Sequence, residues 1–363
     1  MFTFFAGGLM VEGSYEPLFD LLEYRLISYH YMGKPETRFY FEEHRDKFKR
    51  IILDSGAFSA WNAGAKIDID KYADFILEWQ DKIDYIVNLD VIPGYPGLKK
   101  IPQEEIERSA AQGLENYFYL LDKGVDKSKL IHVFHQNEDF KWLEKMLDLG
   151  MEYIGLSPAN DRTTQEKMLW LDDCMRLVTN DKGEPIVKFH GFAVTSFRLM
   201  LRYPWYSVDS STWATVAGRG VVFIPRQRNG RYDYSIDPFK VSLSQVRSKA
   251  DHLDHQSAAT QEYVWNYISS LGFKPGKSDF VLVDAEYKPK PKERVCPPVY
   301  VKNLGLEPPP EGKKWIERIV EDGIINNYRY RMYTNALFLN RFTQTKKEEI
   351  FKNKRRRMGF GLI

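Results

Sequence analysis

The chain has 363 residues, of which 43% are hydrophobic and 15% aromatic, a content that supports a large folded core and excludes global disorder. Its 52 lysine and arginine residues nearly balance its 50 aspartate and glutamate residues, so the overall charge by itself indicates no particular partner. No run approaches the ~18 apolar residues of a membrane span, and the two distant cysteines, Cys174 and Cys296, are typical of reduced thiols, so we expect a soluble, cytoplasmic protein with no membrane partner.

Short apolar runs that end abruptly in polar residues recur along the first two-thirds of the chain. The first is the N-terminal FTFFAGG, which lacks a basic region and therefore predicts a strand and not a signal peptide. Seven further runs follow, at 51–56, 85–91, 130–139, 153–161, 186–192, 205–212 and 221–228. Apolar stretches of this length between turn signals are typical of strands buried on both faces.

Amphipathic stretches of helical length separate most of these runs. They lie at 15–31, 70–83, 103–124, 140–150, 163–179 and 195–204. Such alternation predicts a parallel sheet, and eight strands fit a (β/α)8 TIM-like barrel. A doubly wound open sheet is the alternative, but no Gly-rich dinucleotide loop follows the first strand.

The pattern changes after about residue 245. Residues 246–271 are predicted to be helical, 278–287 form a strand or edge segment, and Pro-rich connectors at 288–298 and 307–314 precede a helical arm over 313–357. We therefore expect a TIM-barrel catalytic domain over 1–245 and a mostly helical extension over 246–363 that ends in a basic tail.

Three of the predicted strands end in a carboxylate, at the position where α/β proteins keep their chemistry. Asp54 precedes Gly56 and other small residues that let a flat ligand approach the backbone, although a capping or turn role explains it equally well. Asp90 precedes a Pro/Gly-rich turn and has an Asx-turn role as its alternative. Asp209 is followed by three hydroxyl residues and is either a nucleophile or a helix N-cap. Two carboxylates on neighbouring strand ends suit chemistry at a glycosidic carbon.

Two histidine pairs suggest metal sites, but neither pair is favoured. His132 and His135 lie three apart on a predicted strand, so their side chains point to opposite faces; His132 is predicted in the core and His135 near the rim. His252 and His255 have helical spacing but lack an evident third ligand. We expect no metal.

The ordered set of motifs resembles the queuine/archaeosine tRNA-guanine transglycosylase superfamily over roughly residues 50–230. The family's base-binding segments are similar, in order, to Asp54-Ser55-Gly56, Asp90, Gln136 and Gly155-Leu156 of this chain. The family's Gly-x-Gly segment, short helix and nucleophilic Asp resemble the stretch from Gly191 to Asp209. Three departures are Ala57, where the family has a second Gly, Cys296, which stands alone where the family has a zinc module, and Ser-Val-Asp-Ser-Ser at 207–211, which replaces the family's sequence around the nucleophile. This divergence is most similar to the phage and bacterial DNA branch, whose enzymes exchange guanine in DNA for a 7-deazaguanine.

The resemblance implies a double displacement without a cofactor, in the cytoplasm of a bacterium or of the host of a phage. Asp209 attacks C1′ of a deoxyguanosine, Asp54 moves protons to and from the bases, and Asp90 with its neighbours reads the purine edge. Phosphate contacts would offset the cost of extracting the base from the duplex. The candidate residues for these contacts are Arg226, Arg228, Arg231, Lys354, Arg355, Arg356 and Arg357, the last four of which equally suit a solvated tail.

Three alternatives remain open. The first is a tRNA-guanine transglycosylase, with tRNA in place of DNA as the partner. The second is a barrel hydrolase that acts on a small glycoside or nucleoside. The third is a non-catalytic nucleic-acid-binding relative, which the joint presence of Asp54 and Asp209 disfavours.

Overall fold

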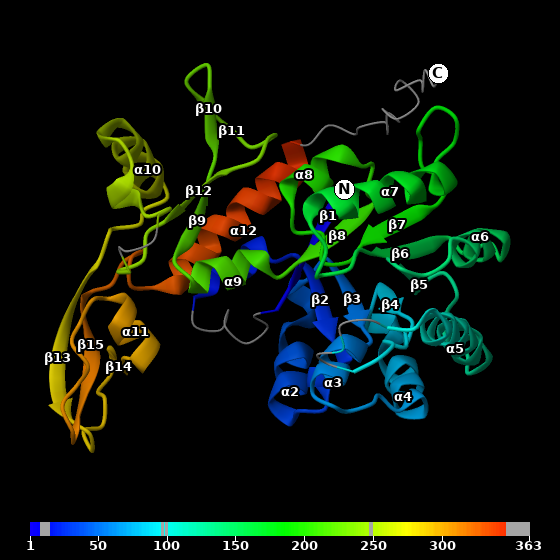
Figure 1. Ribbon diagram of the computed structural model, residues 1–363, viewed down its shortest axis with the longest axis horizontal. Helices are drawn as coiled ribbons and strands as arrows, with labels where there is room; N and C mark the ends of the chain where they lie inside the picture. Colours follow the sequence, from blue (N-terminus) through cyan, green and yellow to red (C-terminus); the bar gives the residue numbers. More distant parts are fainter. Residues whose placement is uncertain (8–14, 96–97, 99–100, 247–249, 346–363) are drawn as a thin grey trace. The chain divides into compact units, whose positions relative to one another are not determined.

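The computed structural model describes residues 1–7, 15–95, 98, 101–246 and 250–345 (Figure 1). The chain forms two compact units. The described residues of the first, the barrel unit, fall within Met1–Met10, Leu22–Ser211 and Thr343–Ile363, and those of the second within Val11–Leu21 and Thr212–Phe342. No helix among the described residues combines the length and the apolar content that crossing a membrane requires.

The barrel unit contains a closed barrel of eight parallel strands in chain order (Figure 1). These are β1 (Phe2–Ala6), β2 (Tyr24–Ser28), β3 (Arg50–Asp54), β4 (Tyr85–Val87), β5 (Leu130–His135), β6 (Tyr153–Ser157), β7 (Lys188–Gly191) and β8 (Ser207–Ser210). The barrel closes where β8 pairs with β1, which places Asp209 beside Phe4. The predicted TIM-like barrel is therefore confirmed.

Helices follow most of the strands. They are α1 (Tyr29–Met32), α2 (Pro35–His44), α3 (Ala57–Asn62), α4 (Ile69–Trp79), α5 (Gln103–Asp122), α6 (Lys141–Asp148), α7 (Thr164–Val178) and α8 (Phe197–Arg202). Local sequence explains where they begin: Asp68 caps α4 by accepting the N–H groups of Asp70 and Lys71, and Thr163 forms a capping box with Glu166 at α7. α4 buries one face through Tyr72, Ala73, Phe75, Ile76 and Trp79, at the spacing of an amphipathic helix.

Two of the predicted elements, one helix and one strand, are wrong. The stretch 15–31, predicted as one helix, instead contains a 3₁₀ turn (Glu16–Leu21), the barrel strand β2 and the short helix α1. Aromatic and aliphatic residues are so dense there that helical and strand periodicities both fit, and pairing of β2 with β1 and β3 decides the outcome. The stretch 221–228, predicted as the eighth barrel strand, instead forms β9 (Val221–Ile224), which pairs antiparallel with β12 (Phe239–Ser242) in the second unit.

The second unit mixes strands and helices. Besides β9 and β12 it contains α9 (Thr212–Gly218), the hairpin of β10 (Arg226–Arg228) and β11 (Arg231–Asp233), α10 (Ala258–Ser270), β13 (Lys277–Asp284), β14 (Glu293–Val295), α11 (Pro298–Asn303), β15 (Lys313–Glu321) and most of α12 (Tyr328–Thr345). The strand predicted at 278–287 is confirmed as β13. The prediction of a helical arm over 313–357 is only partly correct. Lys313–Glu321 is the central strand of the antiparallel sheet β13-β15-β14, and the helix α12 begins at Tyr328. The apolar residues of β15 come in two adjacent pairs, Trp315-Ile316 and Ile319-Val320, whose spacing of four fits a helix, and pairing with β13 and β14 decides that the stretch is a strand.

Side chains that point into the barrel fill it in layers and position the site. Near the amino-terminal end of the strands the guanidinium of Arg50 lies over the Phe2 ring and donates to the hydroxyl of Tyr206 at 2.9 Å. The middle layer is apolar and comprises Phe4, Ile52, Val87 and Val133. Because side chains alternate along a strand, Asp54 lies two positions beyond Ile52 on the same inward face, at the carboxyl end of the barrel.

Candidate active site at the carboxyl end of the barrel

A cavity of about 530 Å³ opens at the carboxyl ends of the barrel strands. Its lining includes Asp54 from the end of β3, Asp90 from the loop after β4, and Asp209 from β8. The structure thus brings together the three carboxylates that the sequence singled out. Aromatic rings form part of the wall, since Phe58 and Trp61 of α3 stack with centroids 6.1 Å apart and Phe192 follows β7.

Asp54 carries an unusual charge environment. Burial, reinforced by the negative charges of Asp90 and Asp209, raises the pKa of its carboxyl from 3.8 to about 7. Its Oδ2 accepts the N–H of Gly56 at 3.1 Å, which fixes the turn into α3. Gly56 has φ +77°, and a Cβ there would lie 2.7 Å from His30, so the backbone fits this turn only without a side chain. The N-cap position of α3 is Gly56 and not Asp54, which leaves the carboxylate directed at the cavity.

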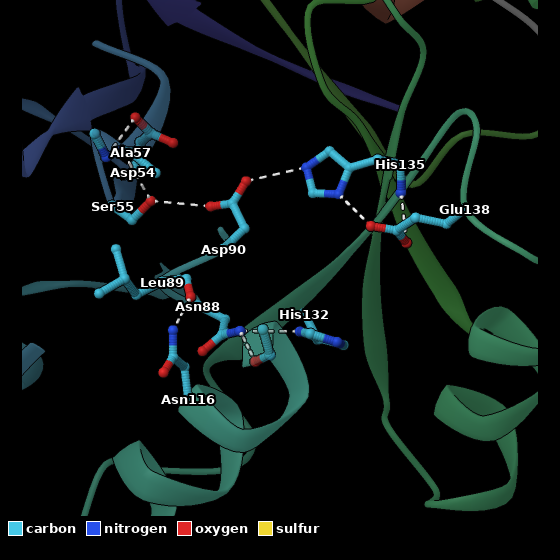
Figure 2. A network of polar contacts seen from close by, with 12 residues as sticks. Asp54, Ser55, Ala57, Asn88, Leu89, Asp90, Asn116, His132, His135 and Glu138 are labelled. Atoms are coloured by element: carbon cyan, nitrogen blue, oxygen red, sulfur yellow. Dashed lines mark hydrogen bonds and ion pairs between the residues drawn. The ribbon is translucent and has the colours of Figure 1, made fainter. Parts of the chain in front are cut away.

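Asp90 is held from two sides (Figure 2). Its Oδ1 accepts the hydroxyl of Ser55 at 3.2 Å, and its Oδ2 accepts Nε2–H of His135 at 3.0 Å. Nδ1–H of the same histidine donates to Glu138 at 3.0 Å. Burial opposes the charge on His135, but the Glu138 and Asp90 carboxylates outweigh it and raise the pKa of His135 to about 10. Burial likewise opposes ionisation of Asp90, yet the His135 hydrogen bond and charge hold the pKa of Asp90 below its ordinary value. The pair is therefore an ionised carboxylate locked to an imidazolium.

Asp209 is buried, with 8% of its surface exposed, and is held by the segment at the end of β7. Its Oδ1 accepts the N–H of Ala193 at 2.7 Å and interacts with Nε2 of His190 at 3.3 Å. Ala193 adopts φ 50°, a left-handed conformation that is uncommon for a residue with a side chain and that concentrates at functional sites. This turn aims the N–H of Ala193 at the carboxylate.

Of the remaining predicted base-binding residues, Gln136 and Ser55 line the cavity, whereas Gly56, Gly155, Leu156 and Gly191 are not part of its lining. Gln136 is in the lining, and its Oε1 accepts the N–H of Ala159 at 3.0 Å. Gly155 is covered by Phe192, whose ring lies 2.5 Å from where a Cβ would be. Leu156 is fully buried, and Gly191 packs against Val194 and Trp205, where a Cβ would lie 2.7 Å and 2.9 Å from side-chain atoms. Ser55 also lines the cavity, and its hydroxyl donates to Asp90.

Sequence reasoning assigned no role to several residues that the structure places here. They are Phe58, Trp61, Glu138, His190, Phe192 and Ala193. The sequence alone gives no signal for His190, because it shares the inward face with Asp209 only through the register that pairs it with Ser207 on β8, two residues before Asp209. A signal for Glu138 was its spacing of three from His135.

The histidines that suggested metal sites make other interactions. His132 is buried on the outer face of β5, beside Tyr117 of α5, and its Nδ1 accepts from Asn88 at 3.0 Å; burial lowers the pKa of His132 to about 4. His135 lines the cavity, so the two side chains take opposite faces as predicted. His252 donates to the carbonyl of Ser244 and accepts the N–H of Asp254. Across the described part of the chain, no group of three or more His, Cys, Asp or Glu side chains is arranged to hold a metal ion.

The predicted phosphate-binding cations that the structure describes are not among the residues that line this cavity. Arg226, Arg228 and Arg231 are exposed on the β10–β11 hairpin of the second unit. Arg226 pairs with Asp237 at 3.3 Å, whereas Arg228 and Arg231 face each other across the two strands. Lys354, Arg355, Arg356 and Arg357 fall outside the described residues. Among the described residues, no lysine or arginine lines the cavity.

Comparison of the chain with models of known protein families and with curated proteins finds no match. Function is therefore inferred from the chemistry of the cavity. It combines a carboxyl with a pKa of about 7 (Asp54), a carboxyl whose pKa is held below its ordinary value (Asp90), and a carboxylate fixed by two donors (Asp209). Pairs of carboxyls whose environments differ in this way are typical of acid–base and nucleophilic catalysis.

Proposed function

We propose that this chain is a pentosyltransferase that replaces guanine in DNA by a 7-deazaguanine derivative, through a covalent bond between Asp209 and the deoxyribose. The observation that carries the proposal is that Asp54 and Asp209 line one cavity in different environments. Asp54 gains or loses a proton near neutral pH, while Asp209 is fixed by hydrogen bonds through one oxygen. The motif order that resembles the transglycosylase superfamily supplies the substrate class.

The first displacement breaks the bond between guanine N9 and C1′. Oδ2 of Asp209 attacks C1′, and the electron pair of the broken bond moves to the base. Protonated Asp54 donates its proton to the departing guanine. The products are free guanine and an ester between Asp209 and C1′, with Asp54 now ionised.

The second displacement reverses these events with a different base. The entering 7-deazaguanine gives its N9 proton to Asp54, N9 attacks C1′, and the electron pair of the ester bond returns to Asp209. Because Asp54 titrates at about 7, both of its protonation states are populated near neutral pH, as a group that donates in one half-reaction and accepts in the other requires.

The cavity walls suit a flat heterocycle. The rings of Phe58, Trp61 and Phe192 line it, and aromatic faces stack on bases of any sequence. Asp90 and Gln136 supply polar atoms at its edge. A base that is paired in a duplex must leave the stack to enter, at a cost of a few kcal/mol. Arg228 and Arg231 are the described cations that we propose for the phosphate contacts that offset this cost.

The test is a base-exchange assay with radiolabelled guanine. The protein is incubated with the label and either a guanine-containing DNA duplex or unmodified tRNA, and label in the polymer is counted. We expect label in DNA only, lost in Asp209→Ala and retained in Asp126→Ala, a control at an exposed carboxylate on the loop before β5. Label in tRNA alone would make the chain a tRNA transglycosylase. Release of guanine without incorporation would make it a hydrolase.

A further inference from the structure

We infer that His190 is a functional donor to the nucleophile, which together with the N–H of Ala193 speeds breakdown of the covalent intermediate. This inference rests on the proposed function and adds a residue to it. Both donors reach the same oxygen, Oδ1 of Asp209, at 3.3 Å and 2.7 Å. Among the described residues, the other oxygen, Oδ2, has no hydrogen-bond partner. The two oxygens are therefore distinguished before any substrate binds.

A buried chain of hydrogen bonds sets the orientation of His190. Its Nδ1 lies 2.5 Å from the hydroxyl of Ser207, which in turn lies 2.5 Å from the hydroxyl of Tyr153. His190 and Ser207 are 0% exposed and Tyr153 is 2% exposed, so water does not compete for these bonds. An ionised carboxylate only accepts, so Nε2 carries the proton; with a neutral ring Nδ1 then accepts from Ser207, whose oxygen accepts from Tyr153. Ser207 and Tyr153 are thus positioning residues that act through His190.

During the reaction Oδ1 of Asp209 changes from a carboxylate oxygen to an ester carbonyl oxygen and back. Oδ2 forms the bond to C1′, so Oδ1 becomes the carbonyl oxygen of the ester. When the entering base attacks C1′, the bond from C1′ to Oδ2 breaks and its electron pair returns to the carboxylate, where the charge spreads over both oxygens. Negative charge therefore develops on Oδ1 in the second half-reaction, where Ala193 and His190 already point their N–H groups.

The sign of the effect follows from this change. A hydrogen bond to an ionised carboxylate is stronger than one to a neutral ester carbonyl. The two donors consequently favour the free carboxylate over the ester, which speeds breakdown and slows formation. Loss of one charge-assisted donor is expected to slow breakdown roughly 10- to 100-fold. Formation should be unchanged or faster.

The experiment measures both half-reactions on the full chain. Enzyme and a guanine-containing DNA duplex are mixed without free base, samples are denatured at intervals, and the fraction of protein bound to DNA is read on a denaturing gel. Excess guanine is then added and the decay of the adduct is followed. The variants are His190→Phe, which removes the donor, and His190→Gln, which restores an N–H. A third variant, Tyr153→Phe, removes the hydroxyl at the far end of the hydrogen-bond chain. His132→Phe is the matched control, because it removes another buried histidine from the neighbouring part of the barrel without reaching the cavity.

The expected result is adduct decay slowed about 10-fold or more in His190→Phe, by less in Tyr153→Phe, and largely restored in His190→Gln. His132→Phe should decay at the wild-type rate even if it unfolds more easily. Equal slowing of formation and decay in His190→Phe would mean a merely structural role and would overturn the inference. Wild-type protein that forms no adduct and incorporates no label would instead overturn the proposed function, and this inference with it.

Discussion

Replacing the proposed catalytic acid–base residue should make the protein more stable at alkaline pH. In Asp54→Asn a neutral amide of nearly the same shape replaces a carboxyl that is buried beside Asp90 and Asp209. The amide oxygen can still accept the N–H of Gly56, so the turn into α3 is preserved. What the substitution removes is the free energy needed to ionise a carboxyl in this environment.

The magnitude follows from the displaced titration. Each pKa unit corresponds to about 1.4 kcal/mol, so a rise from 3.8 to about 7 corresponds to ~4 kcal/mol. Water in the open cavity screens part of this electrostatic cost, so we expect Asp54 to destabilise the folded protein by roughly 2 kcal/mol when it is ionised. The folded-state pKa is raised, so between pH ~4 and pH ~7 the unfolded chain releases a proton that the folded chain retains. Stability of the wild type therefore falls across this interval, and the penalty is fully present above it.

Urea unfolding of both proteins at pH 4.5 and pH 8 measures the effect. Asp54→Asn should match the wild type at the lower pH and exceed it by about 2 kcal/mol at the higher pH, while losing base exchange. Asp90→Asn is the matched control with the opposite sign, because the pKa of Asp90 is depressed and its ionised form stabilises the fold. An Asp54→Asn variant that is less stable than the wild type at pH 8 would refute the reasoning.

Three further predictions test other parts of the structure. His135→Gln should lower the free energy of unfolding in urea by about 2 kcal/mol at pH 6. Because the pKa of His135 is raised to about 10, this loss should shrink as the pH rises from 6.5 through 10. A loss that is independent of pH would contradict the ion pair with Asp90 and Glu138. Arg228→Gln combined with Arg231→Gln should reduce the slope of log affinity for DNA against log salt by about 1.8, whereas Arg162→Gln in the barrel unit should leave the slope unchanged. Gly56→Ala should lower the urea midpoint more than Gly64→Ala, because both have positive φ but only Gly56 has neighbours within 4 Å of the added Cβ; equal losses would show that backbone strain alone matters.

Local sequence pattern predicts most of the barrel because a parallel strand is buried on both faces. Runs such as Arg50–Asp54 and Tyr153–Ser157 are short, apolar and followed by turn residues, and both lie in the barrel as expected. Composition does not distinguish a barrel strand from a buried hairpin strand, which is why Val221–Ile224 was wrongly counted. It also hides Tyr24–Ser28, since leucines before that strand and tyrosines after it continue a helix-like pattern. Partners distant in sequence decide both cases.

The sequence predicted those site residues that are carboxylates at the end of an apolar, strand-like run. Asp54 and Asp209 carry this signal, and the structure places both in one cavity. The role of His190 could not be read in the same way, because it depends on the register that sets β7 beside β8. The left-handed turn at Ala193 has no compositional signal at all, since alanine is not a residue that normally marks positive φ.

The three carboxylates differ in what surrounds them, and the differences assign their parts in the proposed exchange. Asp90 is bonded to an imidazolium and to a hydroxyl, so it stays ionised across the neutral range and is unsuited to carry a proton. Asp209 offers one hydrogen-bonded oxygen and one without a partner among the described residues, as a nucleophile that must also leave requires. Asp54 has a pKa near 7, and burial contributes most to it. The same burial that raises this pKa also raises the free energy of the folded state above pH 7. Activity and stability should therefore change in opposite directions when Asp54 is neutralised, a combination that a purely structural carboxylate would not produce.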